Sequence, residues 1–324
     1  MHLVKLIKRK KNPKFNSIEN VLGVLIPFLN IEEVLELPFL SKGVLNRIKN
    51  IMFLRRHNAR LIHISGHDHY LLWYPFQKAI LTIHDIEALK RKRGLKRWLF
   101  QKLWFDWPIR NAKVVTTISE FSKKEIQSIN NYKTPIQVIY NPLTLPLIYT
   151  PKTFNTAKPR ILHIGTKENK NLSRLIQALK GINCELIIIG KATESIKADL
   201  KTSEIDYTIK SNLSNEEMIT EYKVSDFLAF VSTYEGFGLP ILAAQAVGLP
   251  VLTSNVASMP EVAGEGALLV DPFSVKDIRK GILRLIEEGE LRKILIQKGL
   301  VNINRFDVKI IAKQYNQLYK SALS

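Results

Sequence analysis

The sequence predicts an α/β protein of two domains, each with a parallel sheet covered by helices on both faces. Short apolar runs suited to buried strands alternate with helical stretches along most of the chain, and this alternation is typical of parallel sheets. With 324 residues, of which 46% are hydrophobic, the chain is long enough to fill two cores. Prolines between 142 and 159 indicate a stiff connection. We therefore expect domains at 1–141 and 142–306.

The first half is expected to begin with a strand at 2–7, a basic loop at 8–16 and a helix at 17–25. Further strand-like runs lie at 34–39, 61–65, 79–82, 114–118 and 136–140. Ser119 is a good N-cap for a helix over 121–129. No Gly-x-Gly-x-x-Gly fingerprint follows the first strand, so a dinucleotide site of that type is not predicted.

The second half repeats the alternation. Strand-like runs lie at 160–164, 186–189, 227–231, 251–254 and 267–270. Asn171 is expected to cap a helix over 172–179 that Gly181 ends. Ser214 and Glu217 form a capping-box pattern before another helix. The remaining helices are predicted at 275–287, 291–299 and 307–323.

Positive charge is concentrated in the first half. The net charge is +19, and residues 1–150 hold 25 Lys and Arg against 10 Asp and Glu. Such asymmetry indicates an anionic partner for that half, either a membrane surface or nucleic acid.

Residues 89–110 mix this charge with tryptophan and phenylalanine. Aromatic and basic residues together suit an amphipathic helix on an anionic membrane surface. The alternative is that Leu95, Trp98, Leu99, Lys102 and Leu103 form an apolar stripe on the core, with the charges in solvent. Nucleic acid is disfavoured as a partner, because no recognised nucleic-acid signature is present.

Cysteine content and hydropathy favour a cytoplasmic protein. Cys184 is the single cysteine and lies in an apolar context, which excludes an intrachain disulfide and fits a reducing compartment. The apolar run at 21–29 is too short to span a bilayer, and no signal-peptide cleavage pattern follows it. Peripheral attachment to the inner face of the cell membrane, through 89–110, is the accompanying hypothesis.

Four of the seven histidines fall within a short span that also holds two aspartates. They are His63, His67, His69 and His84. Because their spacing matches no zinc signature, we expect a solvated rim of a cleft rather than a metal site. His84 is better placed than the others, since it follows the strand-like run at 80–83.

A ligand site is suggested at 227–271, where a strand, a glycine-rich turn and a helix follow one another. The turn holds Glu235, Gly236, Phe237 and Gly238, and unpaired amides at a helix N-terminus suit a diphosphate or sugar hydroxyls. Equally, Glu235 could neutralise the helix dipole while the glycines form a tight turn. Spacing alone does not decide between these interpretations.

The turn Glu-Gly-Phe-Gly-Leu-Pro, with the residues after it through Gly264, resembles the donor-site segment of retaining GT-B glycosyltransferases of family 4. The resemblance implies two Rossmann-like domains facing each other across a cleft that holds a nucleotide sugar. Glu235 matches the first acid of the family's Glu-x7-Glu motif, but Ala243 stands where the second acid holds the nucleotide ribose. Gln245 is a poor substitute, because two residues along a helix are about 200° apart.

The resemblance also assigns roles outside this turn. Lys170 matches a lysine that clamps the donor diphosphate, whereas Thr166 occupies the position of the family's arginine. Lys167 is the candidate for the second charge. The donor-binding set then comprises Gly165, Thr166, Lys167, Gly236, Phe237, Gly238, Leu239 and Ala243. His84 matches a histidine that faces the transferred sugar, and the last helix, 307–324, is expected to pack back on the first domain.

The predicted function is that of a retaining, metal-independent hexosyltransferase with Glu235, His84 and Lys170 as catalytic residues. No cofactor is expected beyond a UDP- or GDP-linked sugar as co-substrate. The acceptor is expected to be a hydroxyl of a lipid-linked or surface-polysaccharide glycan. The alternative is a degenerate GT-B protein that binds a sugar, nucleotide or partner without turnover, and Ala243 supports it.

Overall fold

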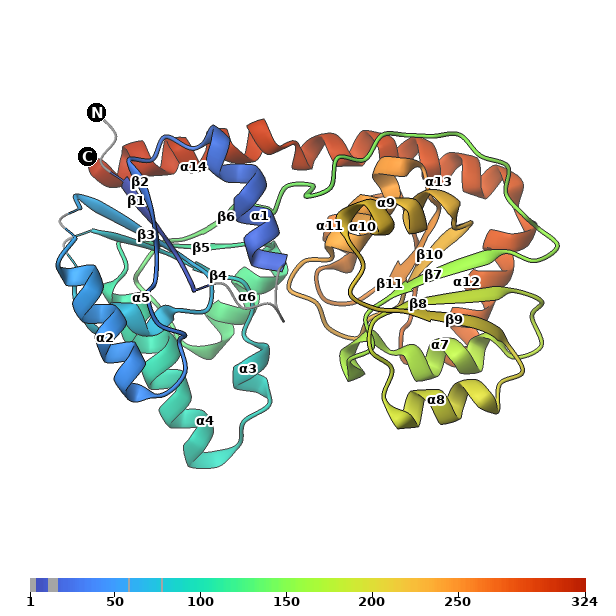
Figure 1. Ribbon diagram of the computed structural model, residues 1–324, viewed down its shortest axis with the longest axis horizontal. Helices are drawn as coiled ribbons and strands as arrows, with labels where there is room; N and C mark the ends of the chain where they lie inside the picture. Colours follow the sequence, from blue (N-terminus) through green and yellow to red (C-terminus); the bar gives the residue numbers. More distant parts are fainter. Residues whose placement is uncertain (1–3, 11–16, 58, 77) are drawn as a thin grey trace. The chain divides into compact units, whose positions relative to one another are not determined.

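The computed structural model describes residues 4–10, 17–57, 59–76 and 78–324. The chain divides into two compact units, which are Met1–Pro142 with Asp307–Ser324 (unit 1) and Leu143–Phe306 (unit 2). Each unit contains a six-stranded parallel sheet with helices on both faces (Figure 1), so the predicted α/β class is confirmed. The boundary expected between 141 and 142 lies one residue from this division. The predicted loop at 11–16 and the start of the strand at 2–7 lie outside the described residues.

The sheet of unit 1 has the order β2-β1-β3-β4-β5-β6. Its strands are β1 (Val4–Lys8), β2 (Glu33–Glu36), β3 (Leu61–Ser65), β4 (Ala79–Ile83), β5 (Val114–Thr117) and β6 (Ile136–Val138). The second strand was predicted at 34–39 but ends at Glu36, because Pro38 has no N–H group to donate to a neighbouring strand.

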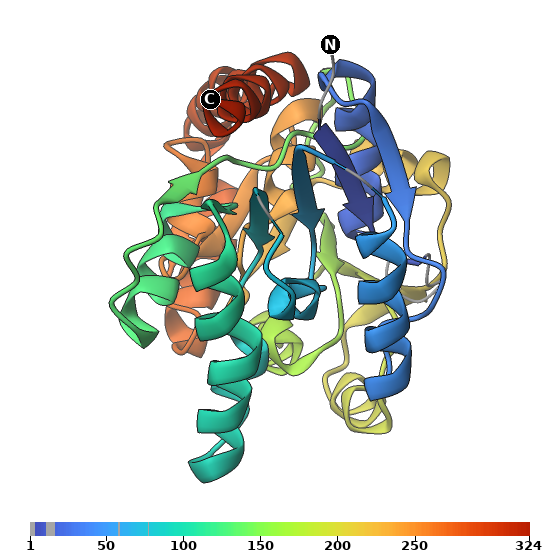
Figure 2. The same ribbon diagram turned by 90° about the vertical axis from the view of Figure 1, so that its left-hand side faces the viewer.

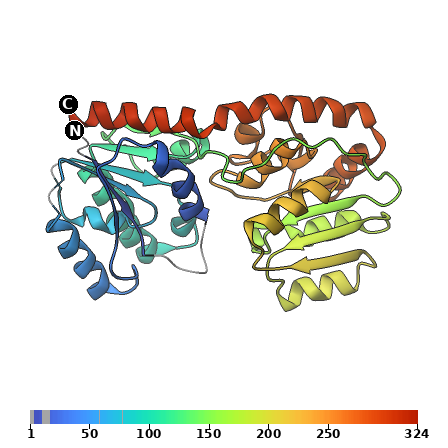
Figure 3. The same ribbon diagram turned by 45° about the horizontal axis from the view of Figure 1, so that its top comes forward.

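Helices cover both faces of this sheet. They are α1 (Ser17–Leu25), η1 (Ile26–Phe28), α2 (Val44–Arg55), η2 (His69–Trp73), α3 (Glu87–Lys90), α4 (Gly94–Gln101), the π-helical η3 (Lys102–Asp106), α5 (Trp107–Asn111), α6 (Glu120–Ile129) and α14 (Val308–Leu323). The terminal helix α14 packs on α1 and β3 (Figure 3), whereas α2, η3 and α5 share a buried cluster on the other face.

The sheet of unit 2 has the order β12-β11-β10-β7-β8-β9. Its strands are β7 (Arg160–Ile164), β8 (Glu185–Ile189), β9 (Asp206–Lys210), β10 (Phe227–Phe230), β11 (Val251–Ser254) and β12 (Leu268–Val270). Its helices are η4 (Glu168–Lys170), α7 (Leu172–Leu179), α8 (Glu194–Lys201), α9 (Asn215–Val224), α10 (Leu239–Val247), α11 (Met259–Ala263), α12 (Val275–Glu287), α13 (Gly289–Asn302) and η5 (Ile303–Phe306). The sequence did not reveal α8 or β9, whose residues are largely polar.

The structure contradicts one of the two interpretations of the segment that forms α4, η3 and α5. Leu95, Trp98 and Leu99 are 77, 56 and 50% exposed, so the interpretation that they form an apolar stripe on the core is wrong. The core contacts come later, where the Phe100 and Trp104 rings stack with centroids 5.2 Å apart. The wider π-helical turn of η3 shifts the following residues around the helix axis, which a period of 3.6 does not anticipate.

Candidate functional site

Lys170 and Glu235 meet in unit 2, at the carboxyl ends of two neighbouring strands. Strand β7 pairs with β10, and the loop after each strand carries one of the two residues. Lys170 Nζ lies 2.5 Å from Glu235 Oε1 and 4.9 Å from the centroid of the Phe230 ring. The side chains are 18 and 15% exposed, respectively. The structure therefore brings together two of the three residues predicted to be catalytic, as an ion pair with limited access to water.

The path of the Lys170 side chain depends on Gly165. Gly165 has φ +94°, and a Cβ atom there would lie 2.8 Å from Lys170 Cγ and 2.9 Å from Lys170 Cε. Only glycine leaves room for the lysine chain at this distance. Asn171 follows in the left-handed conformation, and its Nδ2 donates to Val231 O (3.0 Å) and Pro272 O (2.6 Å). This buried amide, rather than the predicted N-cap bond, fixes the start of α7.

Further hydrogen bonds join the loops that carry the ion pair. Asn169 Nδ2 donates to Tyr234 O (2.8 Å), and Thr233 N donates to Asn169 O (2.8 Å). The hydroxyl of Ser258, before α11, lies 2.9 Å from Glu235 O and 2.6 Å from Phe237 O. The backbone on both sides of Glu235 is thus held by side chains from other elements, as a preorganised site requires.

The glycine-rich turn begins helix α10 as predicted. Gly238 has φ +122° and occupies the N-cap position, and Leu239 is the first helical residue. The Phe237 side chain is only 4% exposed, and its ring lies edge-on to Phe306 with centroids 5.7 Å apart. Phe237 could therefore reach a ligand through its main chain only.

Ala243 lies on α10 and is 5% exposed. Gln245, two residues later, donates from Nε2 to Ala263 O (2.8 Å) and accepts from Asn302 Nδ2 at its Oε1 (2.8 Å). Because both ends of its amide are occupied in the core of unit 2, Gln245 does not replace the missing acid.

The two other predicted donor residues lie on the loop after β7. Thr166 Oγ1 donates to Lys191 O (2.6 Å), whereas Lys167 is exposed. Both line an open cavity of about 480 Å³, to which Arg174 also contributes. Arg174 Nη1 donates to Asn171 Oδ1 (2.8 Å), so this unpredicted cation is held beside the loop.

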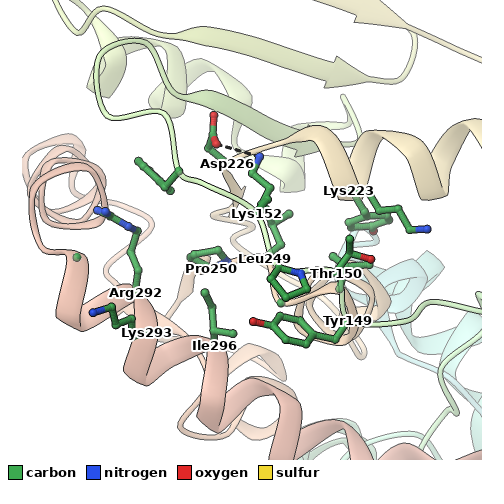
Figure 4. A pocket seen from close by; sticks show the side chains of 16 residues that line it. Tyr149, Thr150, Lys152, Lys223, Asp226, Leu249, Pro250, Arg292, Lys293 and Ile296 are labelled. Carbon is green, nitrogen blue, oxygen red and sulfur yellow. Dashed lines mark ion pairs between the residues drawn. The ribbon is translucent and has the colours of Figure 1, made fainter.

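A second cavity of unit 2, of about 290 Å³ (Figure 4), lies beside the amino ends of β10 and β11. Asp226 and Pro250, which precede β10 and β11, line it together with the connection at 149–154. Lys152 Nζ pairs with Asp226 Oδ1 at 2.9 Å. The guanidinium of Arg292 lies 4.0 Å from the centroid of the Phe154 ring. None of the predicted donor residues lines this cavity.

His84 belongs to unit 1 and directly follows β4. It lines a cavity of about 20 Å³ with His63, Thr82 and Tyr315, among others. Its Nε2 atom is buried and has no hydrogen-bond partner within the described part of the chain. Burial, followed by the neighbouring His67 and His69, lowers the pKa of His84 to about 3. The imidazole is therefore neutral near pH 7.

The expectation that the other histidines lie on a solvated rim is wrong for His63 and His69, which are each 2% exposed. His63 bonds to Tyr319 Oη and Thr82 Oγ1, both at 2.7 Å, and His69 Nδ1 lies 2.8 Å from Trp104 O. Only His67 of the group is exposed. Among residues 4–10, 17–57, 59–76 and 78–324, no three His, Cys, Asp or Glu side chains gather in a group that could hold a metal ion.

These buried histidines predict an acid-sensitive unit 1. Burial lowers the pKa of His63, His69 and His84 to about 3 each, below the ordinary 6.5. Between these values the unfolded chain binds protons that the folded unit does not. The free energy of unfolding should therefore fall as the pH drops from 6.5 toward 4, by about 1.4 kcal/mol per histidine and pH unit. The raised pKa of Asp68, caused by burial, opposes this trend in part.

Urea unfolding followed by tryptophan fluorescence measures this effect selectively, because all four tryptophans lie in unit 1. A His63→Gln variant should show a shallower pH dependence than the natural protein. A pH-independent free energy of unfolding between pH 6.5 and 4.5 would contradict the prediction.

Comparison with known families decides the identity of the chain. Residues 12–145 match the family model described as Glycosyltransferase Family 4, and residues 150–300 match the one described as Glycosyl transferases group 1. The protein is a GT-B glycosyltransferase of the family 4 type. The predicted family and fold are thereby confirmed.

This glycosyltransferase is 28% identical over 291 residues to O-antigen chain mannosyltransferase B of Escherichia coli, covering 80% of this chain and 74% of that protein. It is 28% identical to an MMP alpha-(1->4)-mannosyltransferase of Mycolicibacterium hassiacum, covering 76 and 66%. Among solved structures, HepE of Anabaena in complex with UDP-glucose superposes with a TM-score of 0.80 at 16% identity, covering 99% of this chain and 100% of that one. Sucrose-phosphate synthase of Thermosynechococcus elongatus gives 0.78 at 17% identity, covering 99% of each chain.

The candidate site includes residues that the sequence did not single out. Asn169 and Ser258 brace the loops, and Arg174 adds a cation. Asn169 and Ser258 have no signal of their own in the sequence, because each acts through a contact with a distant segment. Across residues 4–10, 17–57, 59–76 and 78–324, no helix has the length and apolar character needed to cross a bilayer.

Proposed function

We propose that this glycosyltransferase moves a sugar from a nucleotide diphosphate donor to a hydroxyl of a lipid-linked or surface-polysaccharide acceptor, with retention of the anomeric configuration. The observation that carries the proposal is the Lys170–Glu235 pair at the carboxyl ends of β7 and β10, where open parallel sheets bind ligands. The names of relatives support the substrates. One is an O-antigen chain mannosyltransferase, and HepE was crystallised with UDP and with UDP-glucose.

In this proposal the two partners of the ion pair separate when the donor binds. Lys170 turns to the diphosphate and neutralises charge on the leaving group, and Lys167 adds a second cation. Glu235 then accepts hydrogen bonds from sugar hydroxyls. The turn at Gly236, Phe237 and Gly238 lies against the donor, where the absence of two side chains permits a close approach. Positive charge from lysine makes a metal ion unnecessary for this step, and no cofactor is required.

The chemical step exchanges one bond at the anomeric carbon for another. The bond to the β-phosphate oxygen breaks, the bond to the acceptor oxygen forms on the same face of the sugar, and the departing phosphate accepts the acceptor proton. His84 is proposed as a contact for a sugar hydroxyl. Its neutral imidazole, with an unbonded Nε2, can accept or donate one hydrogen bond without adding charge.

A cytoplasmic location accompanies this proposal. The single cysteine, Cys184, is buried, and burial raises the pKa of its thiol to about 11. An unreactive core thiol and the lack of any partner for a disulfide fit a reducing compartment.

A second candidate is a GT-B protein that binds a nucleotide or sugar without turnover. The observation that favours it is Ala243, since no acid occupies that position and Gln245 is bonded elsewhere. The two candidates differ in one measurable respect, because only the enzyme releases the nucleotide from a nucleotide sugar in the presence of an acceptor.

Calorimetric melting with UDP, GDP, ADP and CMP tests the donor class. Calorimetry is needed because the tryptophans report on unit 1, whereas the proposed nucleotide site lies in unit 2. A nucleotide at about a hundred times its dissociation constant should add roughly 2.7 kcal/mol, which raises the midpoint by several degrees. We expect UDP or GDP to produce this shift and Lys170→Met to reduce it. A protein that no nucleotide stabilises would contradict the proposed donor.

A further inference from the structure

Helix α4 in unit 1 presents three large apolar side chains to solvent, although Phe100 on its other side packs toward the core. Leu95, Trp98 and Leu99 are at least half exposed. On the inner side, Gln101 Nε2 donates to Ile129 O at 2.8 Å. A surface helix of a soluble domain normally turns such side chains toward the core. The exposed apolar side of α4 therefore lacks the partner that its composition requires.

Helix α2 also exposes large apolar side chains, which its sequence did not reveal. Val44, Leu45, Ile48 and Met52 lie on one side of the helix and are 62, 75, 45 and 48% exposed. Asn50 faces inward and is fully buried, with its Nδ2 bonded to Phe39 O (3.0 Å) and Tyr70 Oη (2.9 Å). Asn50 and Leu54 thus face the core, whereas four large apolar side chains point away from it.

The two helices lie on the same face of the unit 1 sheet. Leu54 of α2 and Phe105 of η3 belong to one buried cluster. The guanidinium of Arg47 on α2 lies 4.5 Å from the centroid of the Trp104 ring on η3, which continues α4. Figures 1 and 2 show α2 and α4 extending from the same end of unit 1. We call the seven exposed apolar residues of α2 and α4 the α2–α4 surface.

Positive charge surrounds the α2–α4 surface. The sequence has no Asp or Glu at 37–67 or at 88–105, whereas these segments hold six and seven Lys and Arg residues. Lys42, Lys49, Arg93 and Lys96 are exposed. Lysine is depleted at protein–protein interfaces. Lysine and arginine beside exposed tryptophan and leucine are instead the composition of helices that lie in a bilayer interface.

We propose that the α2–α4 surface docks unit 1 on an anionic lipid bilayer. Its apolar side chains enter the boundary between headgroups and acyl chains, Trp98 lies at the level of the headgroups, and the flanking lysines and arginines bind lipid phosphates. The proposed membrane-binding surface therefore includes helix α2 as well as the 89–110 segment named in the sequence analysis. The proposal goes beyond the sugar transfer described above and does not rest on it.

Flotation of the full chain with vesicles tests the proposal without any nucleotide or acceptor. Binding is expected to vesicles of phosphatidylcholine with phosphatidylglycerol and not to phosphatidylcholine alone. The paired replacements Leu95→Ser with Trp98→Ser, and Leu45→Ser with Ile48→Ser, should each weaken binding at least about tenfold. Replacing Arg93 and Lys96 by glutamine should weaken it roughly fivefold per charge.

The matched control is Ile294→Ser with Val301→Ser, which removes two exposed apolar residues from helix α13 of unit 2. This variant should bind vesicles like the natural protein. A blue shift of tryptophan fluorescence on binding should be largely lost in Trp98→Phe, whose flotation is otherwise retained. Circular dichroism confirms that each variant is folded.

Results of two kinds, from flotation and from light scattering, would overturn the proposal. One is flotation that is absent, or that survives both paired replacements. The other is a concentration-dependent dimer in light scattering that the α2 or α4 replacements convert to monomer, because the surface would then bind a second copy of the chain. Failure of sugar transfer with intact flotation would count against the proposed function only.

Discussion

Replacing Lys170 by methionine is expected to lower the rate of sugar transfer by about 10²- to 10³-fold, which is the usual effect of removing one fixed charge or donor from a transition state. Methionine keeps most of the chain length that passes over Gly165 but cannot neutralise a departing diphosphate. The measurement is release of nucleotide from UDP- and GDP-sugars at saturating donor. An unchanged rate in a folded variant would remove Lys170 from the proposed mechanism.

Glu235→Gln separates a catalytic from a structural role for the same pair. Each single replacement leaves the partner's charge largely buried, so the free energy of unfolding of unit 2 should fall by about 1 to 3 kcal/mol. The double variant, Lys170→Met with Glu235→Gln, should lose less free energy of unfolding than the two single variants lose together, because neither charge remains unpaired. Its transfer rate should nevertheless stay as low as that of the weaker single variant. Recovery of the rate together with stability would show that the pair is structural only.

Replacing Ala243 by glutamate is expected to tighten nucleotide binding by roughly 10- to 150-fold. A carboxylate there would supply the one or two charge-assisted bonds to ribose hydroxyls that the natural residue lacks, worth about 1.5 to 3 kcal/mol. Because Ala243 is 5% exposed, the variant without nucleotide should melt at a lower temperature than the natural protein. Isothermal titration with the nucleotide that stabilises the natural protein measures the change.

Ala243→Gln is the control for this replacement, since it adds the same volume without charge. It should recover only a small part of the gain. If glutamate and glutamine have the same effect, or if neither improves affinity, position 243 does not face the nucleotide. If only the glutamate variant binds a nucleotide at all, the natural protein is the degenerate binder rather than the enzyme.

The sequence was sufficient to predict both sheets, with the exception of the edge strand β9 and the helix α8 before it in unit 2. Buried strands such as β10 are continuous apolar runs, and these are recognisable without neighbours. Strand β9 is half exposed at the sheet edge and reads Asp-Tyr-Thr-Ile-Lys. Such a strand is defined by hydrogen bonds to β8, which the sequence does not record.

The sequence named candidate site residues one by one, but it did not predict which of them are in contact. Lys170 and Glu235 were each named from separate motifs, and they lie 65 positions apart. Their contact follows from the pairing of β7 with β10, which are neighbours in space but not in the chain. Asn169 and Ser258 could not be found in advance for the same reason, because their bonds depend on that strand order.

The sequence also did not determine which side of each helix in unit 1 faces the core. The period of apolar residues in α4 shows that one side is apolar, but it does not show which side meets the core. Gln101 and Phe100 determine that orientation through contacts with residues 129 and 104. Likewise, His63 was placed on a rim because its spacing from the other histidines matches no zinc signature, whereas Tyr319 and Thr82 satisfy it in the interior.

The ion pair between Lys170 and Glu235 also affects which anions can bind at the proposed donor site. The carboxylate is attached to the same fold as the lysine, so its effective concentration at that ammonium group is in the millimolar range or higher. Free phosphate or another small anion must displace this carboxylate from Lys170, so it should bind weakly. A nucleotide sugar adds contacts through its base, ribose and sugar, and these can compensate for breaking the pair. On the proposed roles, Glu235 would therefore act as a built-in competitor that keeps common cellular anions out of the donor site.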